Sequence, residues 1–184
     1  MDIKTHIETA WNHTLSHIVP LLIITLVLVA VSVISLGILA PVAMAGYMHA
    51  LLLLVREGRE PSASDIFSQM HLFFPLLIFG ILVLIITLIG FLLLVLPGFI
   101  FALLASFFSL YMIPIMTDRK FGLIDAFKKS FFTVTRENTV DHIVVFVVFW
   151  GITALGSSFM ITALFCQPLA TLFLVSVYDE VIRT

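Results

Sequence analysis

Residues 72–116 read LFFPLLIFGILVLIITLIGFLLLVLPGFIFALLASFFSLYMIPIM, a run of 45 positions without a charged side chain. A transmembrane helix needs about 20 mostly apolar residues, so this stretch is too long for one crossing and long enough for two. Gly90 and the Pro97–Gly98 pair lie near its middle. Because glycine commonly follows the end of one helix and proline begins the next, the stretch predicts two membrane-crossing helices joined by a tight turn.

Two further apolar stretches, residues 18–55 and 143–178, are similarly long. Gly37 and Pro41 interrupt the first, and Gln167–Pro168 interrupts the second. The pattern predicts an all-α polytopic membrane protein whose six transmembrane helices form three helical hairpins. The expected spans are residues 18–37, 39–56, 72–95, 97–117, 141–159 and 164–182.

The composition agrees with a membrane protein, since 61% of the residues are hydrophobic, 11% are charged and the mean hydropathy is +1.22. A soluble domain has about 25% charged residues. All nine Lys and Arg and all eleven Asp and Glu lie in four short islands. The islands are residues 2–8, 56–65, 118–141 and 179–183.

With three hairpins, all four islands lie on one side of the membrane. Lys and Arg favour the cytoplasmic side, so we expect a multi-pass protein of the plasma (inner) membrane with cytoplasmic N- and C-termini. The net charge of −2 gives no basic excess, so no nucleic-acid partner is expected. Membrane lipids are the expected partners, with a homo-oligomer or a protein partner at the cytoplasmic face as further candidates.

An amphipathic pattern precedes each predicted hairpin, which is typical of helices lying in the headgroup plane. Ser62 and Asp65 add a capping-box-like start to the second pattern. The three patterns divide the single membrane domain, residues 1–184, into approximate repeats over 2–57, 62–117 and 121–183. The apolar stripes are Ile3, Ile7, Ala10, Trp11, Thr14, Leu15 and Ile18, then Ala63, Ile66, Phe67, Met70 and Phe74, then Ile124, Phe127, Phe131 and Val134.

Polar residues inside the predicted spans are few, and histidine is the only ionisable acid or base deep among them. His49 lies seven positions before Arg56, about 10 Å inside the charged boundary at 1.5 Å per residue. It is either a proton relay or headgroup contact, or a neutral imidazole hydrogen-bonded to a neighbouring helix. Tyr47, Tyr111 and Tyr178 fall toward the cytoplasmic ends of spans, where an aromatic belt is expected.

Signatures of enzymes and metal sites are missing from the sequence. It contains no GxSxG elbow, no Gly-rich phosphate loop and no HExxH or Cys/His cluster. His13 and His17 have i, i+4 spacing without further metal ligands, and the acidic residues of 118–141 alternate with basic ones as in a self-paired loop. We therefore expect no enzyme activity, no catalytic residues, no cofactor and no metal.

Four short motifs resemble a pattern shared by a group of small prokaryotic multi-span proteins. The motifs are Leu96–Ile100, Tyr111–Asp118, Gly122–Ser130 and Thr135–Asn138. The group includes YciC-like inner-membrane proteins and the membrane domain fused to some glycerophosphodiester phosphodiesterases. The resemblance implies work near phospholipids, although the phosphodiesterase domain and its catalytic residues are absent here. Asn138 stands where relatives often have Gly.

Two functions follow from these patterns. The first is a non-enzymatic protein that interacts with lipid, organises the membrane or docks a partner, with its lipid and interface contacts at Trp11, Phe67, Phe127, Lys128, Lys129 and Arg136. The alternative is a channel or transporter for a small or amphipathic solute, with an intramembrane polar site at His49, Ser106, Ser109 and Thr153.

Overall fold

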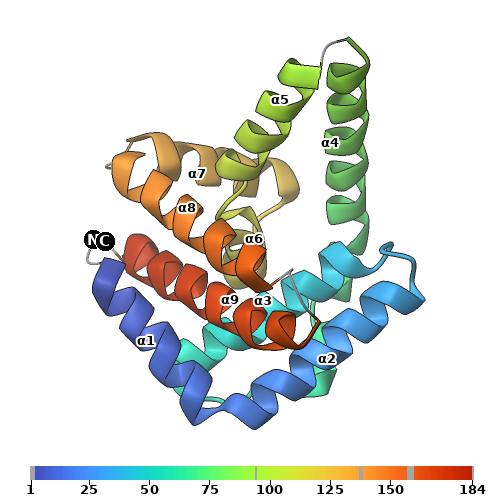
Figure 1. Ribbon diagram of the computed structural model, residues 1–184. Helices are drawn as coiled ribbons and strands as arrows, with labels where there is room; N and C mark the ends of the chain where they lie inside the picture. The colour runs from blue at the N-terminus through green and yellow to red at the C-terminus, as the bar shows by residue number, and fades with distance from the viewer. Residues whose placement is uncertain (1–2, 94, 137–138, 157–159, 184) are drawn as a thin grey trace.

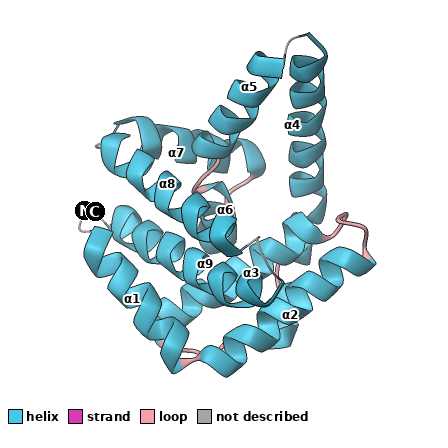
Figure 2. Cartoon of the chain, viewed as in Figure 1, coloured by secondary structure: helices cyan, strands magenta, loops and turns pink. Residues whose placement is uncertain are grey.

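The computed structural model describes residues 3–93, 95–136, 139–156 and 160–183, and every regular element within these ranges is helical (Figures 1 and 2). The predicted all-α class is therefore confirmed. The α-helices are α1 (Ile3–Ser16), α2 (Ile18–Ile34), α3 (Ala40–Glu57), α4 (Phe73–Leu93), α5 (Val95–Phe108), α6 (Met112–Arg119), α7 (Leu123–Arg136), α8 (Thr139–Gly156) and α9 (Met160–Arg183). The 3₁₀ helices are η1 (Ala63–Phe67) and η2 (Met70–Leu72).

Four helical segments in the described part of the chain are long and apolar enough to cross a membrane. Helices α1 and α2 meet at an angle of 91° and form a fifth candidate if this bent pair counts as one span. Length and composition thus support four or five crossings, whereas the sequence predicts six. The four segments are Ala63–Leu92, Leu96–Arg119, Thr139–Gly156 and Thr162–Ile182.

The first predicted turn, between α2 and α3, lies where the glycine and proline indicate. Gly37 has φ = 83°, a left-handed conformation that favours glycine, and Pro41 lies in the first turn of α3. Gly58 ends α3 in the same left-handed conformation.

Helices α4 and α5 pack side by side and project from the rest of the molecule (Figure 1). Their backbones approach closely at two glycines, since a Cβ atom on Gly90 would lie 2.7 Å from the Cα of Gly98. The proline and glycine expected at the turn instead belong to the first turns of α5. The connection itself, at residue 94, lies outside the described residues.

The predicted span over residues 97–117 falls within the candidate segment Leu96–Arg119, and its helix is interrupted between α5 and α6. Pro114 has no N–H group to donate, and its ring clashes with the carbonyl four positions earlier in a continuous helix. Ser130 of α7 occupies the break. Its hydroxyl donates to the Phe108 carbonyl at 2.7 Å and accepts the Tyr111 N–H at 3.2 Å.

The amphipathic helix predicted over residues 62–74 is also different in the structure, which has η1 and η2 there. Ile66 of η1 is fully buried, and η1 crosses α3 at Gly46. The capping interaction is as predicted, since the Asp65 carboxylate accepts the Ser62 N–H at 2.9 Å. Tertiary burial of one side chain has thus replaced a regular surface helix with two short turns.

Gln167 and Pro168, which interrupt the last apolar stretch of the sequence, lie inside α9 and not at a turn. Gln167 donates toward the Met44 sulfur at 3.8 Å and does not cap a helix at a turn. The connection at residues 157–159 lies outside the described part of the chain.

The core forms around α3 and α9, and α9 contacts α1, α2, α3 and α8. The three tyrosines are fully buried here, so the predicted aromatic belt is wrong for them. The tyrosine hydroxyls pair with polar side chains from other helices. The pairs are Tyr47 with Thr25 at 3.0 Å, Tyr111 with His142 at 3.0 Å and Tyr178 with Asp118 at 2.9 Å.

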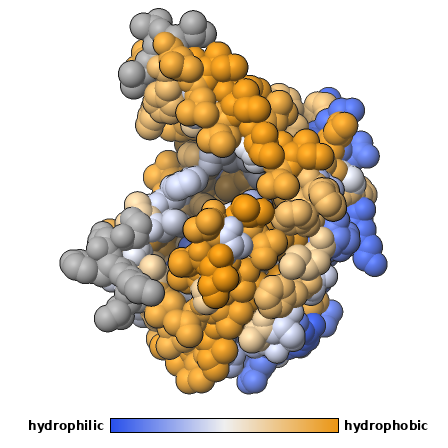
Figure 3. Space-filling view, turned by 90° about the vertical axis from the view of Figure 1, so that its right-hand side faces the viewer, coloured by the Kyte–Doolittle hydropathy of each residue, from blue (hydrophilic) through white to orange (hydrophobic). Residues whose placement is uncertain are grey.

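Hydrophobic residues cover most of the face in Figure 3, and hydrophilic residues gather along its right-hand edge. Many large apolar side chains of α4 and α5 are exposed, including Leu92 at 85%. This surface is typical of a protein surrounded by lipid, because soluble proteins rarely expose contiguous apolar patches of such extent.

Candidate functional site

Arg56, at the end of α3, connects three of the four charged islands. Its Nε donates to Asp179 of α9 at 2.5 Å, while Nη1 and Nη2 donate to the two carboxylate oxygens of Asp118 of α6 at 2.5 and 3.1 Å. The Arg56 side chain is 23% exposed, and those of Asp118 and Asp179 are 13% and 12% exposed. A guanidinium held in this two-pronged way is more directional than an ammonium would be.

Two further contacts extend this charged network. The Tyr178 hydroxyl donates to Asp118, and Arg119 Nε lies 3.7 Å from the same carboxylate. His6 of α1 links the first island to α9. Its Nε2 lies 2.6 Å from Glu180, and its Nδ1 lies 2.8 Å from Ser176 Oγ. All four islands therefore contribute to one charged end of the molecule.

Helix α1 has two different faces beside this charged end. Its buried face carries His6, Ala10 and Thr14, which lie against the bundle. Part of its apolar stripe is exposed, with Trp11 at 46% and Leu15 at 49%, whereas Ala10 and Thr14 of the same stripe are buried. The exposed part of the stripe is available to lipid.

The apolar side chains of α7 are divided between its buried and exposed faces. Its buried face is mostly small or polar, and Ile124 and Phe132 are exposed. Phe127 is half-buried with its ring 5.9 Å from that of Phe79, so it packs against α4. Phe67 of η1, in contrast, is 45% exposed.

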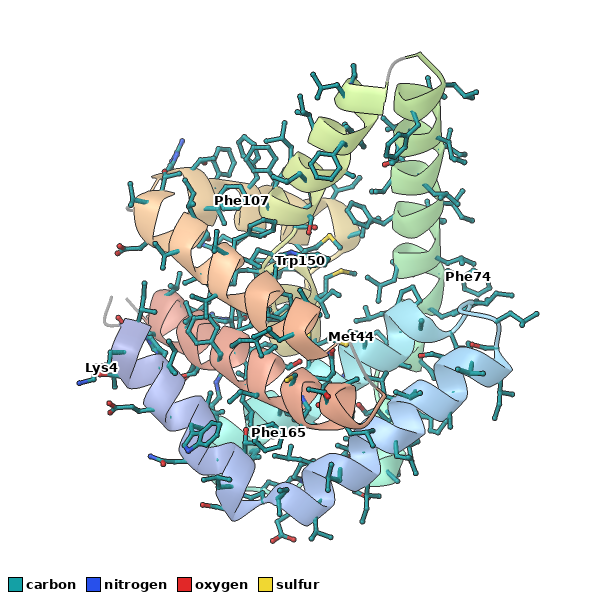
Figure 4. All side chains as sticks on the ribbon, in the orientation of Figure 1. Lys4, Met44, Phe74, Phe107, Trp150 and Phe165 are labelled. Atoms are coloured by element: carbon teal, nitrogen blue, oxygen red, sulfur yellow. The ribbon has the colours of Figure 1, made fainter. Side chains whose placement is uncertain are left out.

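The cations predicted to contact headgroups are on the surface of α7. Lys128 and Lys129 are exposed, and the Arg136 guanidinium lies 4.7 Å above the ring of Phe132. In Figure 4, Lys4 of α1 points away from the bundle.

Three residues of the predicted intramembrane polar site lie on α3, α5 and α8, and Ser109 lies in the break that follows α5. His49 of α3 is half-buried, and its Nδ1 has no hydrogen-bond partner among the described residues. Ser109 donates to the Ala105 carbonyl of α5, and Thr153 donates to the Phe149 carbonyl of α8. Both hydroxyls therefore bond to the backbone carbonyl four positions earlier in the chain, and not to another helix.

Ser106 lines an apolar groove of about 430 Å³ between α5 and α8. The other lining side chains are Phe99, Ala102, Leu103, Phe146 and Trp150. Figure 4 shows Trp150 on α8 and Phe107 in the neighbouring aromatic cluster.

Within the described residues, no group of three His, Cys, Asp or Glu side chains is arranged to hold a metal ion. The sequence interpretation missed the pairings of Arg56 with Asp118 and Asp179. A signal for them was present, because residues of opposite charge stand at the same-side ends of three predicted spans. The His6 contacts had no comparable signal, since they depend on how α1 folds back on α9.

No family model, curated protein or solved structure matches this chain. Its class is therefore defined by fold and composition. It is an all-helical protein whose described part includes four helices, or five with the bent pair, that are long and apolar enough to span a membrane.

Proposed function

We propose that the chain is a non-enzymatic integral protein of the plasma membrane that binds phospholipid at the cytoplasmic leaflet and organises lipid or a partner there. The observation that carries this proposal is the exposed part of the apolar stripe of α1. His6 ties the buried face of α1 to α9 at the charged end, while Leu15 is 49% exposed and Trp11 is 46% exposed with its ring edge-on to Phe165 of α9. The resemblance to membrane domains fused to a lipid-headgroup phosphodiesterase favours the same function.

The proposed topology places the charged end in the cytoplasm and lets α2 and α3 cross as a further hairpin. These helices have 17 and 18 residues, about 26 and 27 Å at 1.5 Å per residue. The hydrocarbon core is about 30 Å thick, so both helices nearly span it. Six crossings then leave every charged island on one side.

Two forces favour the placement of α1 at the leaflet surface. The exposed side chains of its stripe gain burial among acyl chains, worth about 25 cal/mol per Å² of apolar surface. Cations near an anionic leaflet add about 1 kcal/mol each, a gain that salt reduces. Lys4 is well placed for this, because its side chain is 84% exposed.

The test replaces the stripe of α1 while leaving its buried face intact. In the double variant Trp11→Gln/Leu15→Gln, we expect less phospholipid per protein after purification in mild detergent, measured as phosphorus content. The matched control is Glu8→Gln/Asn12→Gln on exposed polar positions of the same helix. Unchanged phospholipid in a folded stripe variant would contradict the proposed function.

The groove between α5 and α8 favours a second candidate, movement of an amphipathic solute along the membrane-embedded surface. Its lining is almost entirely apolar, with the Ser106 side chain as the polar exception. In proteoliposomes, Ser106→Phe should abolish flux of a fluorescent amphiphile, and Ser68→Phe on the exposed surface should leave it unchanged. Equal flux in both variants would count against transport through this groove.

A further inference from the structure

A second pocket, of about 420 Å³, lies where α6, α7 and the end of α9 meet. Its polar lining consists of Arg119, Lys129 and Thr133, and its apolar lining includes Ile115 and the adjacent Val181 and Ile182. The pocket adjoins the charged network, because Arg119 follows Asp118 directly and lies 3.7 Å from its carboxylate.

The polar side chains of this pocket are donors and cations. Arg119 supplies a guanidinium, Lys129 an ammonium and Thr133 a hydroxyl. Asp118, the acid beside Arg119, already accepts two hydrogen bonds from Arg56 and one from Tyr178. Positive charge at the pocket is therefore only partly balanced, which favours an anion with several acceptor oxygens.

The remaining lining favours an amphiphile over a small hydrated anion. Ile115 is fully buried, and Val181 and Ile182 are half-buried, so part of the pocket wall is hydrocarbon. Phe121, also at the pocket, is 43% exposed. A phosphate ester with an attached glycerol and acyl chain would satisfy the donors and the apolar wall together, whereas inorganic phosphate would satisfy only the donors.

We propose that this pocket binds the phosphodiester of an anionic phospholipid, with its oxygens between Arg119 and Lys129 and its glycerol against Val181 and Ile182. The inference rests on the proposed lipid-binding function and adds to it a defined site and a headgroup preference. The charge pairing of Arg119 and Lys129 with phosphate gives the selectivity, and the α1 stripe gives general attachment to the leaflet.

The experiment compares phosphatidylglycerol with phosphatidylcholine of identical acyl chains, bound to the detergent-solubilised full chain and counted by native mass spectrometry. We expect the wild-type chain to prefer phosphatidylglycerol. In Arg119→Gln/Lys129→Gln, this preference should fall about tenfold, as expected when two charge-assisted contacts are lost. The control Arg59→Gln removes one cation whose side chain is 48% exposed and lies outside the pocket lining, so it should keep the preference.

Further measurements test whether the pocket itself gives the preference, and whether an intact lipid is needed or a free headgroup suffices. Lys129→Gln alone leaves Arg119 and its contact with Asp118 intact and should still lower the preference. Thr133→Val keeps the side-chain shape, removes the hydroxyl and should lower it less. Millimolar inorganic phosphate and glycerophosphoglycerol should not displace phosphatidylglycerol, because neither contacts the apolar wall as a lipid does.

The outcomes distinguish this inference from the proposed function. An equal loss of preference in Lys129→Gln and Arg59→Gln would show diffuse attraction and overturn the pocket, as would displacement by inorganic phosphate. A wild-type chain that retains lipid without headgroup preference would also overturn it, while leaving the proposed function intact. A chain that retains no lipid at all would contradict the proposed function itself.

Discussion

At the scale of single residues, Arg56 is central to the charged network, because one guanidinium pairs with two carboxylates from different helices. Asp118 and Asp179 are each less than 15% exposed as side chains. Burying a charge is unfavourable unless it is paired and hydrogen-bonded. The charged network therefore depends on Arg56, and its removal leaves two poorly solvated negative charges beside each other.

Replacing Arg56 with Gln should lower the free energy of unfolding by about 3 kcal/mol, the loss typical of breaking a buried ion pair by removing one partner. Unfolding in mixed detergent micelles with increasing dodecyl sulfate measures this change. The control Arg59→Gln removes a more exposed arginine, whose side chain is 48% exposed in its pair with Asp65, and should cost less than about 1 kcal/mol.

A triple variant tests whether unpaired charge is the cause. Arg56→Gln/Asp118→Asn/Asp179→Asn should recover part of the stability lost in Arg56→Gln, because it removes the uncompensated carboxylates. No recovery would indicate that the shape of the Arg56 side chain, and not its charge, stabilises this end.

At the scale of elements, close packing of backbone explains two departures from regular helices. The carbonyl oxygens of Asp65 and Ile66 in η1 lie against the position that a Cβ atom would take on Gly46 of α3. Only glycine permits this approach, so η1 and α3 are fixed in register. Ser130 similarly connects α7 to the break between α5 and α6.

Gly46→Ala should destabilise the fold by about 2 kcal/mol or more, since the added methyl group meets backbone that cannot move independently. Gly80→Ala in α4 provides the matched control, because a Cβ atom there meets nothing within 4 Å. At that position, alanine should be neutral or stabilising by up to about 1 kcal/mol from its higher helix propensity. The same detergent unfolding assay measures both, and equal stability of the two variants would contradict the close approach of η1.

Ser130→Ala should reduce stability by about 1–3 kcal/mol, because it leaves a buried carbonyl and N–H at the break without their side-chain partner. Ser64→Ala, at an exposed position of η1, is expected to change stability by less than about 0.5 kcal/mol. Hydrogen exchange should also show faster exchange of the Tyr111 amide in Ser130→Ala. Unchanged exchange would mean that the hydroxyl does not protect this amide.

At the scale of the whole molecule, the proposed topology predicts that all four charged islands lie on one side of the membrane. Cysteines introduced at Lys4, Glu60 and Asp125, in a Cys166→Ser background, should react with a membrane-impermeant maleimide only from the cytoplasmic side. Cysteines at Ile38, between α2 and α3, and at Leu92, near the end of α4, are 56% and 85% exposed and should not react from the cytoplasmic side. Labelling of any two island positions from opposite sides would refute the one-sided arrangement.

Much of the architecture follows from local patterns. The length of the apolar stretches predicts the membrane class. Gly37 and Pro41 mark the turn between α2 and α3, because the backbone angles that glycine and proline allow depend on the residue itself. The same reasoning fails at Pro168, which lies inside α9, and at residues 62–74. At both places, tertiary contacts override the local preference. The packing of α9 in the core outweighs the turn signal at Pro168, and the burial of Ile66 outweighs the helix signal in residues 62–74.

The candidate site divides in the same way. The sequence by itself determined which residues are charged, that they lie in four islands and that long apolar stretches separate them, because composition and spacing suffice for this. Only the tertiary structure decided that Arg56, Asp118, Asp179 and His6 meet at one end, and that Trp11 faces outward while Phe127 packs inward. These contacts join residues distant in the chain, so their geometry depends on how the helices cross and not on any local pattern.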